Sequence, residues 1–143
     1  MQQTFTIGTF GIITNEQNHV LLCLRTDCDY WNLPGGGLEK WESPSQWVIR
    51  EIKEETWFDA EVIKLHGIYS KTHKNEIVFS FECRIIGGEI TLNEEARDIK
   101  YFPSHEIPEN TFWNHIERIK DYFESKKENK VIFKIQKGNS AIK

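Results

Sequence analysis

The fold is decided by residues 31–58, which read WNLPGGGLEKWESPSQWVIREIKEETWF. The first part of this stretch contains Pro-Gly-Gly-Gly at residues 34–37. Proline has no backbone N–H and glycine loosens the chain, so a packed helix or a central strand is disfavoured here. We therefore expect a loop over residues 26–41, and loops on a rigid scaffold often carry function.

The second part of the stretch carries the signals of a helix start. Ser43 can cap the helix, Pro44 suits the first helical position, and Gln46 completes a capping box with Ser43. The pattern predicts a helix that runs from Pro44 to about Thr56.

Three acids share one face of that helix. Glu51, Glu54 and Glu55 are three or four residues apart, which brings their like charges together. Two explanations stay open. The helix could be a solvated surface helix in which Arg50 and Lys53 dilute the repulsion, or a hard divalent cation such as Mg²⁺ could bind the carboxylate oxygens. The neighbouring glycine loop favours the cation, because its backbone can approach an ion or a phosphate closely.

The rest of the chain shows strand patterns and one further helix pattern. Apolar residues at spacings of three and four predict a helix over residues 111–125, capped by Asn110 or Thr111. β-Branched and aromatic residues predict strands over residues 4–14, 20–24, 60–69, 76–86, 99–102 and 131–135. Two helices far apart in the chain are consistent with an α/β fold in which a mixed sheet is covered on both faces.

Length and charge limit the class of protein. The chain has 143 residues, with 18 Lys and Arg against 22 Asp and Glu, and a formal net charge of −4. We expect a single domain over residues 1–143, with a core of about residues 3–125 and a C-terminal extension over residues 126–143. A mildly acidic chain does not offer the basic face that binding to a nucleic-acid polymer requires.

Cysteine usage and hydropathy indicate the compartment. The three cysteines form no CxxC pair, which favours reduced thiols. No apolar run is long enough to cross a membrane, and the first residues lack the pattern of a signal peptide. We expect a cytoplasmic protein with no membrane partner.

The acids and the glycine loop together resemble a known family signature. Gly36 is followed after five residues by Glu42, and after seven more by the run Arg-Glu-Ile-Lys-Glu-Glu at residues 50–55. This spacing resembles the signature of the Nudix hydrolases, and the resemblance extends from Gly36 to Phe58. It implies an α/β/α sandwich with a mixed β-sheet between helices.

The resemblance also implies roles for the residues of the helix. Glu51 and Glu55 would be the main metal ligands, and Glu54 would be a further ligand or the base that activates water. Arg50 would orient these carboxylates through charge-assisted hydrogen bonds.

Further roles fall on residues around the helix. Glu42 would assist at the metal site or hold the loop, and the carbonyl of Gly35 or Gly36 could complete the metal coordination. A carboxylate from a later loop, Glu95 or failing that Glu94, could bind metal or act as the base.

Trp57 departs from the signature, since the family has glycine at this position. That glycine ends the helix in a left-handed conformation, which tryptophan adopts only with a strain of about 1–2 kcal/mol. We therefore expect the helix to end differently here, with metal binding retained because the acids precede Trp57.

The activity implied by the resemblance is Mg²⁺-dependent hydrolysis of a diphosphate bond in a nucleoside diphosphate linked to another moiety, with Mn²⁺ as a substitute ion. One alternative is a sanitising pyrophosphohydrolase of nucleoside triphosphates, including oxidised ones. Another is a non-catalytic nucleotide-binding module. A homodimer could form through the predicted helix over residues 111–123 or the strand over residues 131–135.

Substrate residues are less clearly indicated. Arg25 and either Lys71 or Lys74 could bind phosphate, and an aromatic side chain could stack on a base. The aromatic candidates are Tyr30, Trp31, Trp41, Tyr69 and Trp113. His115 and the other four histidines show no metal-ligand spacing, and the sequence assigns them no role.

Overall fold

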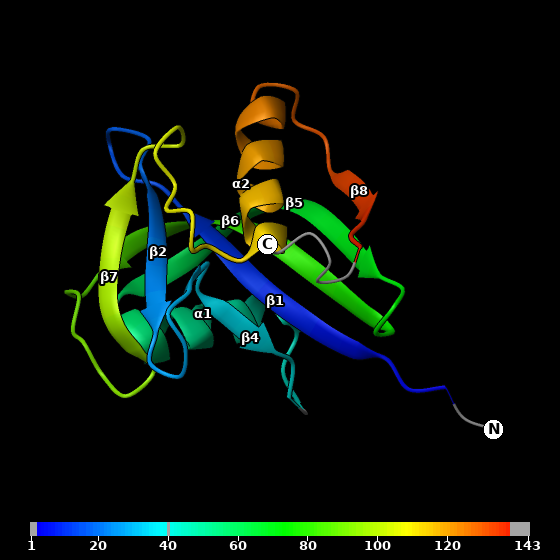
Figure 1. Cartoon of the computed structure of the whole chain (residues 1–143), viewed down its shortest axis with the longest axis horizontal. Helices are drawn as coiled ribbons and strands as arrows, with labels where there is room; N and C mark the ends of the chain where they lie inside the picture. The colour runs from blue at the N-terminus through cyan, green and yellow to red at the C-terminus, as the bar shows by residue number, and fades with distance from the viewer. Residues whose placement is uncertain (1–2, 40, 138–143) are drawn as a thin grey trace.

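The computed structural model describes residues 3–39 and 41–137. Its two helices and eight strands follow one another in the order shown in Figure 1. The elements are β1 (Thr6–Ile13), β2 (Val20–Arg25), β3 (Trp31–Asn32), β4 (Gly35–Gly37), α1 (Pro44–Thr56), β5 (Asp59–Lys71), β6 (Glu76–Gly87), β7 (Ala96–Phe102), α2 (Trp113–Ser125) and β8 (Ile132–Ile135).

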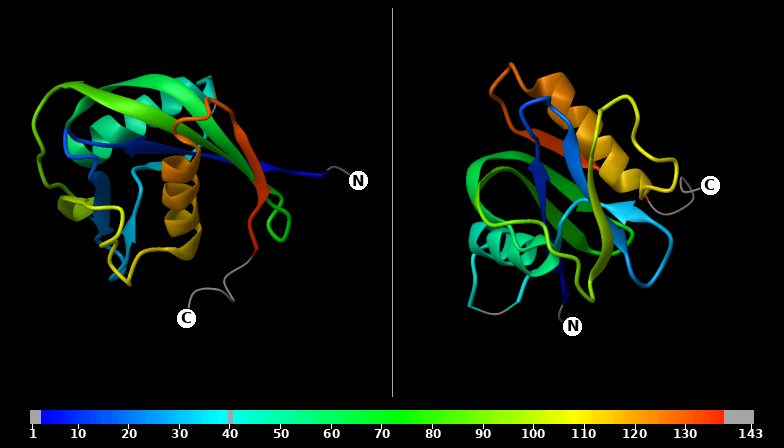
Figure 2. Two further views of the ribbon diagram at one scale, coloured as in Figure 1. Left: turned by 90° about the horizontal axis from the view of Figure 1, so that it is seen from above. Right: turned by 90° about the vertical axis from the view of Figure 1, so that its left-hand side faces the viewer.

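The strands form two sheets. The larger sheet has five strands in the order β4-β1-β6-β5-β8, and it is mixed: β1 and β6 are parallel, as are β5 and β8, whereas β5 and β6 are antiparallel. The smaller sheet is antiparallel, in the order β3-β2-β7. In both views of Figure 2, α1 and α2 lie on opposite sides of β1. The predicted mixed sheet between helices is confirmed.

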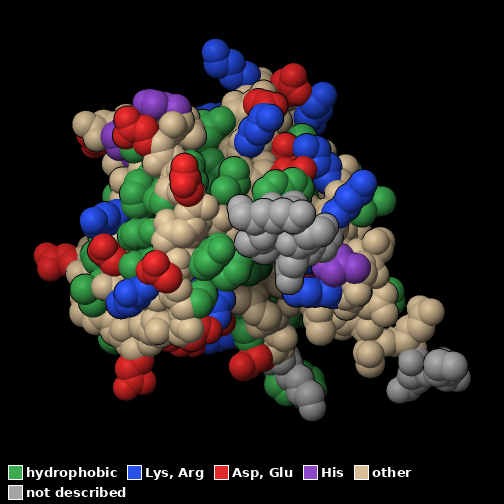
Figure 3. All heavy atoms as spheres, viewed as in Figure 1, with side chains coloured by type: hydrophobic (Ala, Val, Ile, Leu, Met, Phe, Trp, Pro, Cys, Tyr) green, Lys and Arg blue, Asp and Glu red, His purple; other side chains and the backbone are tan. Residues whose placement is uncertain are grey.

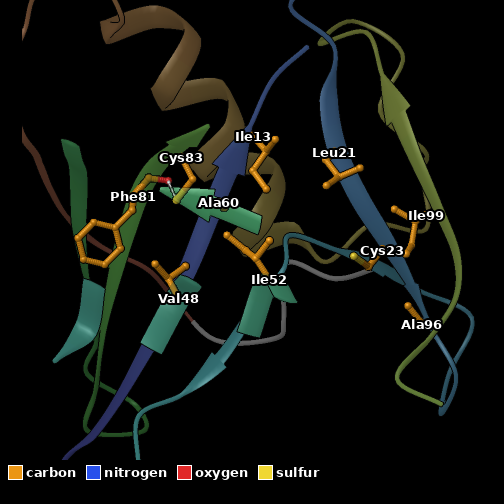
Figure 4. Close-up of a cluster of buried hydrophobic side chains, with 10 residues drawn as sticks. All are labelled: Ile13, Leu21, Cys23, Val48, Ile52, Ala60, Phe81, Cys83, Ala96 and Ile99. Atoms are coloured by element: carbon orange, nitrogen blue, oxygen red, sulfur yellow. Dashed lines mark hydrogen bonds between the residues drawn. The ribbon is translucent and has the colours of Figure 1, made fainter. Parts of the chain in front are cut away.

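Neighbouring residues of β1 divide the core into two layers, because successive side chains of a strand point to opposite faces. Ile13 packs in a cluster that includes Val48 and Ile52 of α1, as Figure 4 shows. Ile12 packs on the other face, in a cluster that includes Ile119 of α2. The sheet is therefore anchored to a helix on each face.

The glycine loop contains two short strands, so the prediction of an irregular loop throughout residues 26–41 is wrong. β4 pairs with β1, with Gly35 opposite Phe10 and Gly36 opposite Thr9. Strand pairing is possible because β4 is an edge strand, and because Gly35 adopts a φ of 151°. A Cβ atom at Gly35 would lie 2.7 Å from the Cα of Phe10, so the backbones can approach only at a glycine.

Helix α1 begins as predicted, and its end contains a correction. Ser43 and Gln46 form the predicted capping box. The expectation that Trp57 would force a different ending is wrong, because Trp57 itself adopts the left-handed conformation, with φ 68° and ψ 4°. Its N–H donates to the carbonyl of Lys53 at 2.9 Å, and the Lys53 ammonium lies 5.4 Å from the centre of the indole ring. These contacts offset the strain of the left-handed residue.

Helix α2 begins later than predicted and without a side-chain cap. Its N-cap residue is Phe112, so the prediction of Asn110 or Thr111 as the cap is wrong. The side-chain amide of Asn110 instead donates to the carbonyl of Asp29 at 2.7 Å, because it joins the loop that precedes β3.

The end of the described chain returns to the large sheet. The predicted late strand is present as β8, which pairs in parallel with β5. Beyond it, Gln136 accepts hydrogen bonds from the fully buried Arg118 of α2, at 3.2 Å from Nε and 2.9 Å from Nη2. Within residues 3–39 and 41–137, neither helix has the length and hydropathy to span a membrane.

Charges of both signs are distributed over the face seen in Figure 3. Acidic and basic side chains alternate there, and no extended basic area gathers on this face.

Candidate active site

Three carboxylates meet beside the glycine loop. Oxygen atoms of Glu51, Glu55 and Glu95 lie within 4.8 Å of one another. The first two are one helical turn apart on α1. Asn93 brings the third to them, because its side-chain amide donates to the carbonyls of Glu54 and Glu55, both at 3.0 Å. Its Oδ1 in turn accepts from the backbone N–H of Glu95 at 2.7 Å. The loop before β7 is thereby fastened to the end of α1.

The environment of these acids disfavours their charged forms. Burial, followed by the charge of Glu54, raises the pKa of Glu51 to about 7. Burial, followed by the charge of Glu51, raises the pKa of Glu55 well above its ordinary value. A cation among these oxygens would reverse both effects, since an opposite charge favours the ionised form. Three carboxylate oxygens this close together can coordinate a single ion, and oxygen ligands of this kind fit a hard divalent cation.

Backbone of the glycine loop lies against the same acids. The N–H of Gly35 donates to Oε2 of Glu55 at 3.1 Å. A Cβ atom at Gly36 would lie 3.0 Å from Oε1 of Glu51, so the backbone there is in close contact with that carboxylate. The glycines therefore place polar backbone groups beside the acid cluster, where a larger residue would collide.

Arg50 organises the carboxylates outside the cluster. Its Nε donates to Oε1 of Glu42 at 2.9 Å, its Nη1 pairs with Glu54, and its Nη2 lies 3.6 Å from Oε1 of Glu51. The guanidinium is stacked over the ring of the buried Trp47, with Cζ 4.1 Å from the ring centroid. The structure thus turns the carboxylate of Glu54 toward Arg50, and the cluster of three does not contain it.

A cleft of about 580 Å³ opens over the acid cluster. Glu55, Glu95 and the backbone of Gly35 and Gly36 line one side of it. Glu94, the alternative to Glu95, also lines the cleft. The other lining residues include cationic side chains and aromatic rings: Arg25, Lys71, Lys74, Phe10, Phe112 and His115. A cleft with acids, cations and rings can hold a metal ion, phosphates and a planar group together.

The predicted substrate residues differ in their positions. Arg25 lines the cleft and forms an ion pair with Asp27 at 2.6 Å. Lys71 also lines the cleft, and its ammonium lies 3.2 Å from a carboxylate oxygen of Glu76. Tyr30 is not among the residues that line the cleft, and its ring packs on Phe112 with 4.9 Å between centroids. Phe112 lines the cleft in its place.

The sequence did not indicate four of the residues that line this cleft: Phe10, Phe112, Asn114 and His115. Phe10 belongs to the apolar pattern of a strand, and the other three lie where a helix begins, so each fits a purely structural role. Among the other aromatic candidates, Trp31 and Tyr69 are buried and Trp41 is exposed. The sequence hint was that residues 112, 114 and 115 lie close together in the chain. Only the tertiary structure shows that they line the same wall of the cleft.

Comparison with known proteins agrees with this architecture. The family model described as NUDIX domain matches residues 4–123. A protein of Methanocaldococcus jannaschii named ADP-ribose pyrophosphatase is 34% identical over 125 residues, covering 81% of this chain and 72% of the relative. A protein of Bacillus subtilis (strain 168), provisionally named 8-oxo-dGTP diphosphatase, is 30% identical over 119 residues, covering 82% of this chain and 80% of the relative.

A solved structure shares the fold. The crystal structure of an ADP-ribose pyrophosphatase from Streptococcus suis superposes with a TM-score of 0.80 at 24% identity, and the match covers 93% of this chain and all of the other. The resemblance expected from residues 36–58 is confirmed.

Proposed function

This chain belongs to the Nudix hydrolase family, and we propose that it is a Mg²⁺-dependent enzyme that cleaves a diphosphate bond in a nucleoside diphosphate linked to another moiety. The observation that carries this proposal is the cluster of Glu51, Glu55 and Glu95 at the edge of a cleft that also holds cations and aromatic rings.

The acid cluster would hold the metal. Glu51 and Glu55 would supply the carboxylate ligands, and Glu95 and the backbone of Gly36 lie beside them. A divalent ion bound there would neutralise charge on the phosphate oxygens and lower the pKa of a coordinated water. Mn²⁺ would substitute for Mg²⁺, since both are hard ions that bind oxygen ligands.

Charged side chains of the chain itself would orient the substrate and the acids. Arg25, Lys71 and Lys74 line the cleft and would bind the diphosphate oxygens. Arg50 holds Glu42 and Glu54 and lies close to Glu51, which limits the rotation of a metal-binding side chain. Phosphoryl transfer depends mostly on such positioning and on charge stabilisation.

The proton of the attacking water requires an acceptor, and two acids are candidates. Glu95 lies in the cleft and belongs to the acid cluster, whereas Glu54 is paired with Arg50. We assign the base to Glu95 and a supporting role to Glu54. Glu95→Gln should therefore lower kcat by about 100-fold or more, and Glu54→Gln by about tenfold or less. The reverse order would assign the base to Glu54.

A second activity has support from one relative. The Bacillus subtilis protein provisionally named 8-oxo-dGTP diphosphatase is 30% identical to this chain. The second candidate is therefore a nucleoside triphosphate pyrophosphohydrolase, for which the products would be a nucleoside monophosphate and pyrophosphate. A nucleoside diphosphate derivative would instead yield two monophosphate products.

The test is a substrate panel of nucleotide sugars, ADP-ribose, dinucleotides and nucleoside triphosphates, with and without Mg²⁺. Glu51→Gln and Glu55→Gln should each lower metal-dependent turnover by about 100-fold or more, whereas Glu89→Gln, at an exposed residue that does not line the cleft, should leave it unchanged. Nucleotide binding without turnover of any panel member would favour a non-catalytic module instead.

We also infer a cytoplasmic single domain over residues 1–143 that could form a homodimer. Free thiols at Cys23, Cys28 and Cys83 fit a reducing compartment. The exposed Phe133 and Ile135 on the edge strand β8 offer an apolar surface for a second copy. Size-exclusion chromatography of the wild type and of Phe133→Lys would test the dimer.

A further inference from the structure

We propose that the cleft wall opposite the acids is a nucleobase subsite, in which Phe112 stacks on the base and Nε2 of His115 donates a hydrogen bond to an acceptor on the base edge. This inference rests on the proposed function in one respect: it takes the ligand of the cleft to be a nucleotide. It adds that the base of the nucleotide is recognised and that His115 forms the hydrogen bond to it.

A backbone contact fixes the tautomer of His115. Its Nδ1 lies 2.9 Å from the backbone nitrogen of Leu33, at a buried position between β3 and β4. A backbone N–H can only donate, so Nδ1 must be the acceptor and carries no proton. The neutral ring then holds its proton on Nε2.

The surroundings keep the ring neutral. Burial, followed by the positive charges of Arg118 and Lys71, lowers the pKa of His115 well below its ordinary value. A protonated ring would also place an N–H of its own against the N–H of Leu33. His115 is therefore a hydrogen-bond donor, and not a titrating group, near neutral pH.

The donor points toward the cleft. His115 is only 7% exposed, and it is one of the residues that line the cleft. Nδ1 is used internally, so Nε2 is the remaining polar atom of the ring, and within residues 3–39 and 41–137 the side chain makes no hydrogen bond other than the one from Leu33. Phe10 holds the ring edge-on with 4.8 Å between centroids. A donor with a fixed direction and no internal acceptor, on a residue that lines a cleft, is suited to recognise a ligand.

Phe112 supplies a flat surface next to this donor. Its ring lines the cleft, with its centroid 5.9 Å from that of His115. Tyr30 packs on it at 4.9 Å, and the guanidinium carbon of Arg25 lies 5.8 Å from its centroid. The ring is thus held in place at the junction between the cationic and aromatic parts of the cleft, where the base of a bound nucleotide would follow its phosphates.

The donor restricts the ligand chemistry. A lone N–H pairs with a base edge that presents a carbonyl oxygen or an unprotonated ring nitrogen, and guanine and uracil, which both carry such carbonyl groups, serve as the test bases. A ligand without a base, such as ribose 5-phosphate, can use the cations and the metal but not His115. The difference between these ligands isolates the subsite.

Two substitutions at one position separate recognition from structure. His115→Asn keeps an oxygen near the position of Nδ1 to accept from Leu33, and it removes the donor at Nε2. His115→Gln places an amide nitrogen near Nε2 and removes the acceptor for Leu33. The pair is therefore matched, with opposite expected effects on binding and on stability.

The experiment is calorimetric titration of the full chain with GMP, UMP and ribose 5-phosphate in the presence of Mg²⁺. For the wild type we expect GMP or UMP to bind about tenfold or more tightly than ribose 5-phosphate. His115→Asn should lower the affinity for the preferred nucleotide by about tenfold and change the affinity for ribose 5-phosphate by less than about twofold. His115→Gln should retain more of the nucleotide affinity than His115→Asn while lowering Tm more, because the N–H of Leu33 loses its acceptor.

Three results would overturn the proposal. One is a wild type that binds neither nucleotide more tightly than ribose 5-phosphate. Another is equal weakening of all three ligands by His115→Asn, which would indicate a structural role. The third is an unchanged nucleotide affinity in that variant. All three measure binding of monophosphates without hydrolysis, so a failure of the proposed activity is recorded separately by the substrate panel.

The stacking surface has its own control. Phe112→Leu keeps much of the apolar volume and removes the aromatic face. It should therefore lower the affinity for the nucleotide by about tenfold and leave the affinity for ribose 5-phosphate unchanged. Phe133→Leu, at an exposed position of β8, should change neither. Unchanged nucleotide binding in Phe112→Leu would remove the stacking half of the proposal.

Discussion

The two walls of the cleft were assembled in different ways. The acid wall comes mostly from residues 35–55, joined by Glu94 and Glu95 from the loop before β7. The opposite wall draws Phe10 from β1, Lys71 from β5 and residues 112–115 from the start of α2. A wall built from one local stretch can be recognised by its spacing, whereas a wall assembled from distant segments becomes visible only in the folded chain.

The walls also differ in their electrostatics. The acid wall concentrates like charges, and burial raises the pKa of Glu51 and Glu55. In the opposite wall, the polar ring of His115 has its internal hydrogen bond satisfied and stays neutral. The acid wall therefore needs a bound cation to relieve the repulsion between its carboxylates. The opposite wall has no such repulsion and needs no cation before it binds its ligand.

The largest expected effect separates the walls by kinetics. Glu55→Gln should lower kcat by about 10²–10³-fold, because it removes a charged metal ligand. The same change should stabilise the metal-free protein, since it removes a buried carboxylate that burial and Glu51 both disfavour. His115→Asn should instead act mainly on KM. Steady-state kinetics and urea unfolding of both variants, with Glu89→Gln as control, test this contrast.

The next effect concerns the contact between the acid wall and β1. Gly35→Ala should lower the free energy of unfolding by about 3 kcal/mol, because its Cβ would meet the backbone of β1 and its φ of 151° suits only glycine. Gly37→Ala is the matched control, since its Cβ would lie 4.0 Å from the carbonyl oxygen of Ile7, which is an ordinary contact distance. Equal costs in the two variants would contradict the close approach at Gly35.

A smaller effect tests the support behind the opposite wall. Gln136→Ala should cost about 2 kcal/mol, because Arg118 is fully buried and both Nε and Nη2 donate to the Gln136 side chain. The Arg118 guanidinium lies 5.0 Å from the ring centroid of Phe10, so nucleotide affinity should fall as well. Glu128→Ala, at an exposed position of the turn before β8, should change the unfolding free energy by less than about 0.5 kcal/mol. Chemical denaturation measures both.

The acid wall also predicts a pH dependence for the metal-free protein. With a pKa of about 7 when folded and an ordinary value of 4.5, Glu51 holds a proton in the folded state that the unfolded chain releases. Stability from this group is present below the unfolded pKa and is lost as pH rises through 7, by about 1–2 kcal/mol after allowance for solvent around the side chain. Urea unfolding in EDTA from about pH 5 to about pH 8 measures the slope. Glu51→Gln should reduce the slope, and the double variant Glu51→Gln/Glu55→Gln should flatten it, because the pKa of Glu55 is raised as well. A slope that persists in the double variant would show that other groups cause it.

The smallest effect lies at the end of α1. Trp57→Gly should stabilise the protein by about 0.5–1 kcal/mol, because glycine adopts the left-handed conformation without strain. Trp57→Ala should destabilise it, since alanine keeps the strain and loses the contact with Lys53. Thermal melts of the two variants should therefore shift in opposite directions. Shifts of the same sign would mean that side-chain contacts, and not backbone strain, dominate at this position.

Much of the fold could be predicted from local patterns. Ser43 and Gln46 form the capping box that their spacing indicated, and the strands around α1 appear close to their predicted bounds. Errors arose where a tertiary contact overrode a local preference. Asn110 does not cap α2, because its side-chain amide donates to the carbonyl of Asp29. The glycine run pairs with β1, although its composition favours a loop.

The site shows the same division. Glu51 and Glu55 come together because one helical turn separates them, which any helix over those residues would ensure. Glu95 joins them only because Asn93 binds the end of α1. Glu54 lies on the same helix face, but its carboxylate pairs with Arg50 and lies outside the cluster. The spacing of the acids alone could not show this difference.

The sequence by itself determined the family, the capped helix and the acids that it presents, because these features depend on contacts between residues fewer than ten positions apart. The tertiary structure alone decided which later acid completes the cluster, how Trp57 is held, and that His115 faces the cleft with its proton on Nε2. The last depends on a hydrogen bond between residues 82 positions apart. Local chemistry can be read from spacing, whereas a contact across that distance exists only after the core on both faces of the sheet has closed.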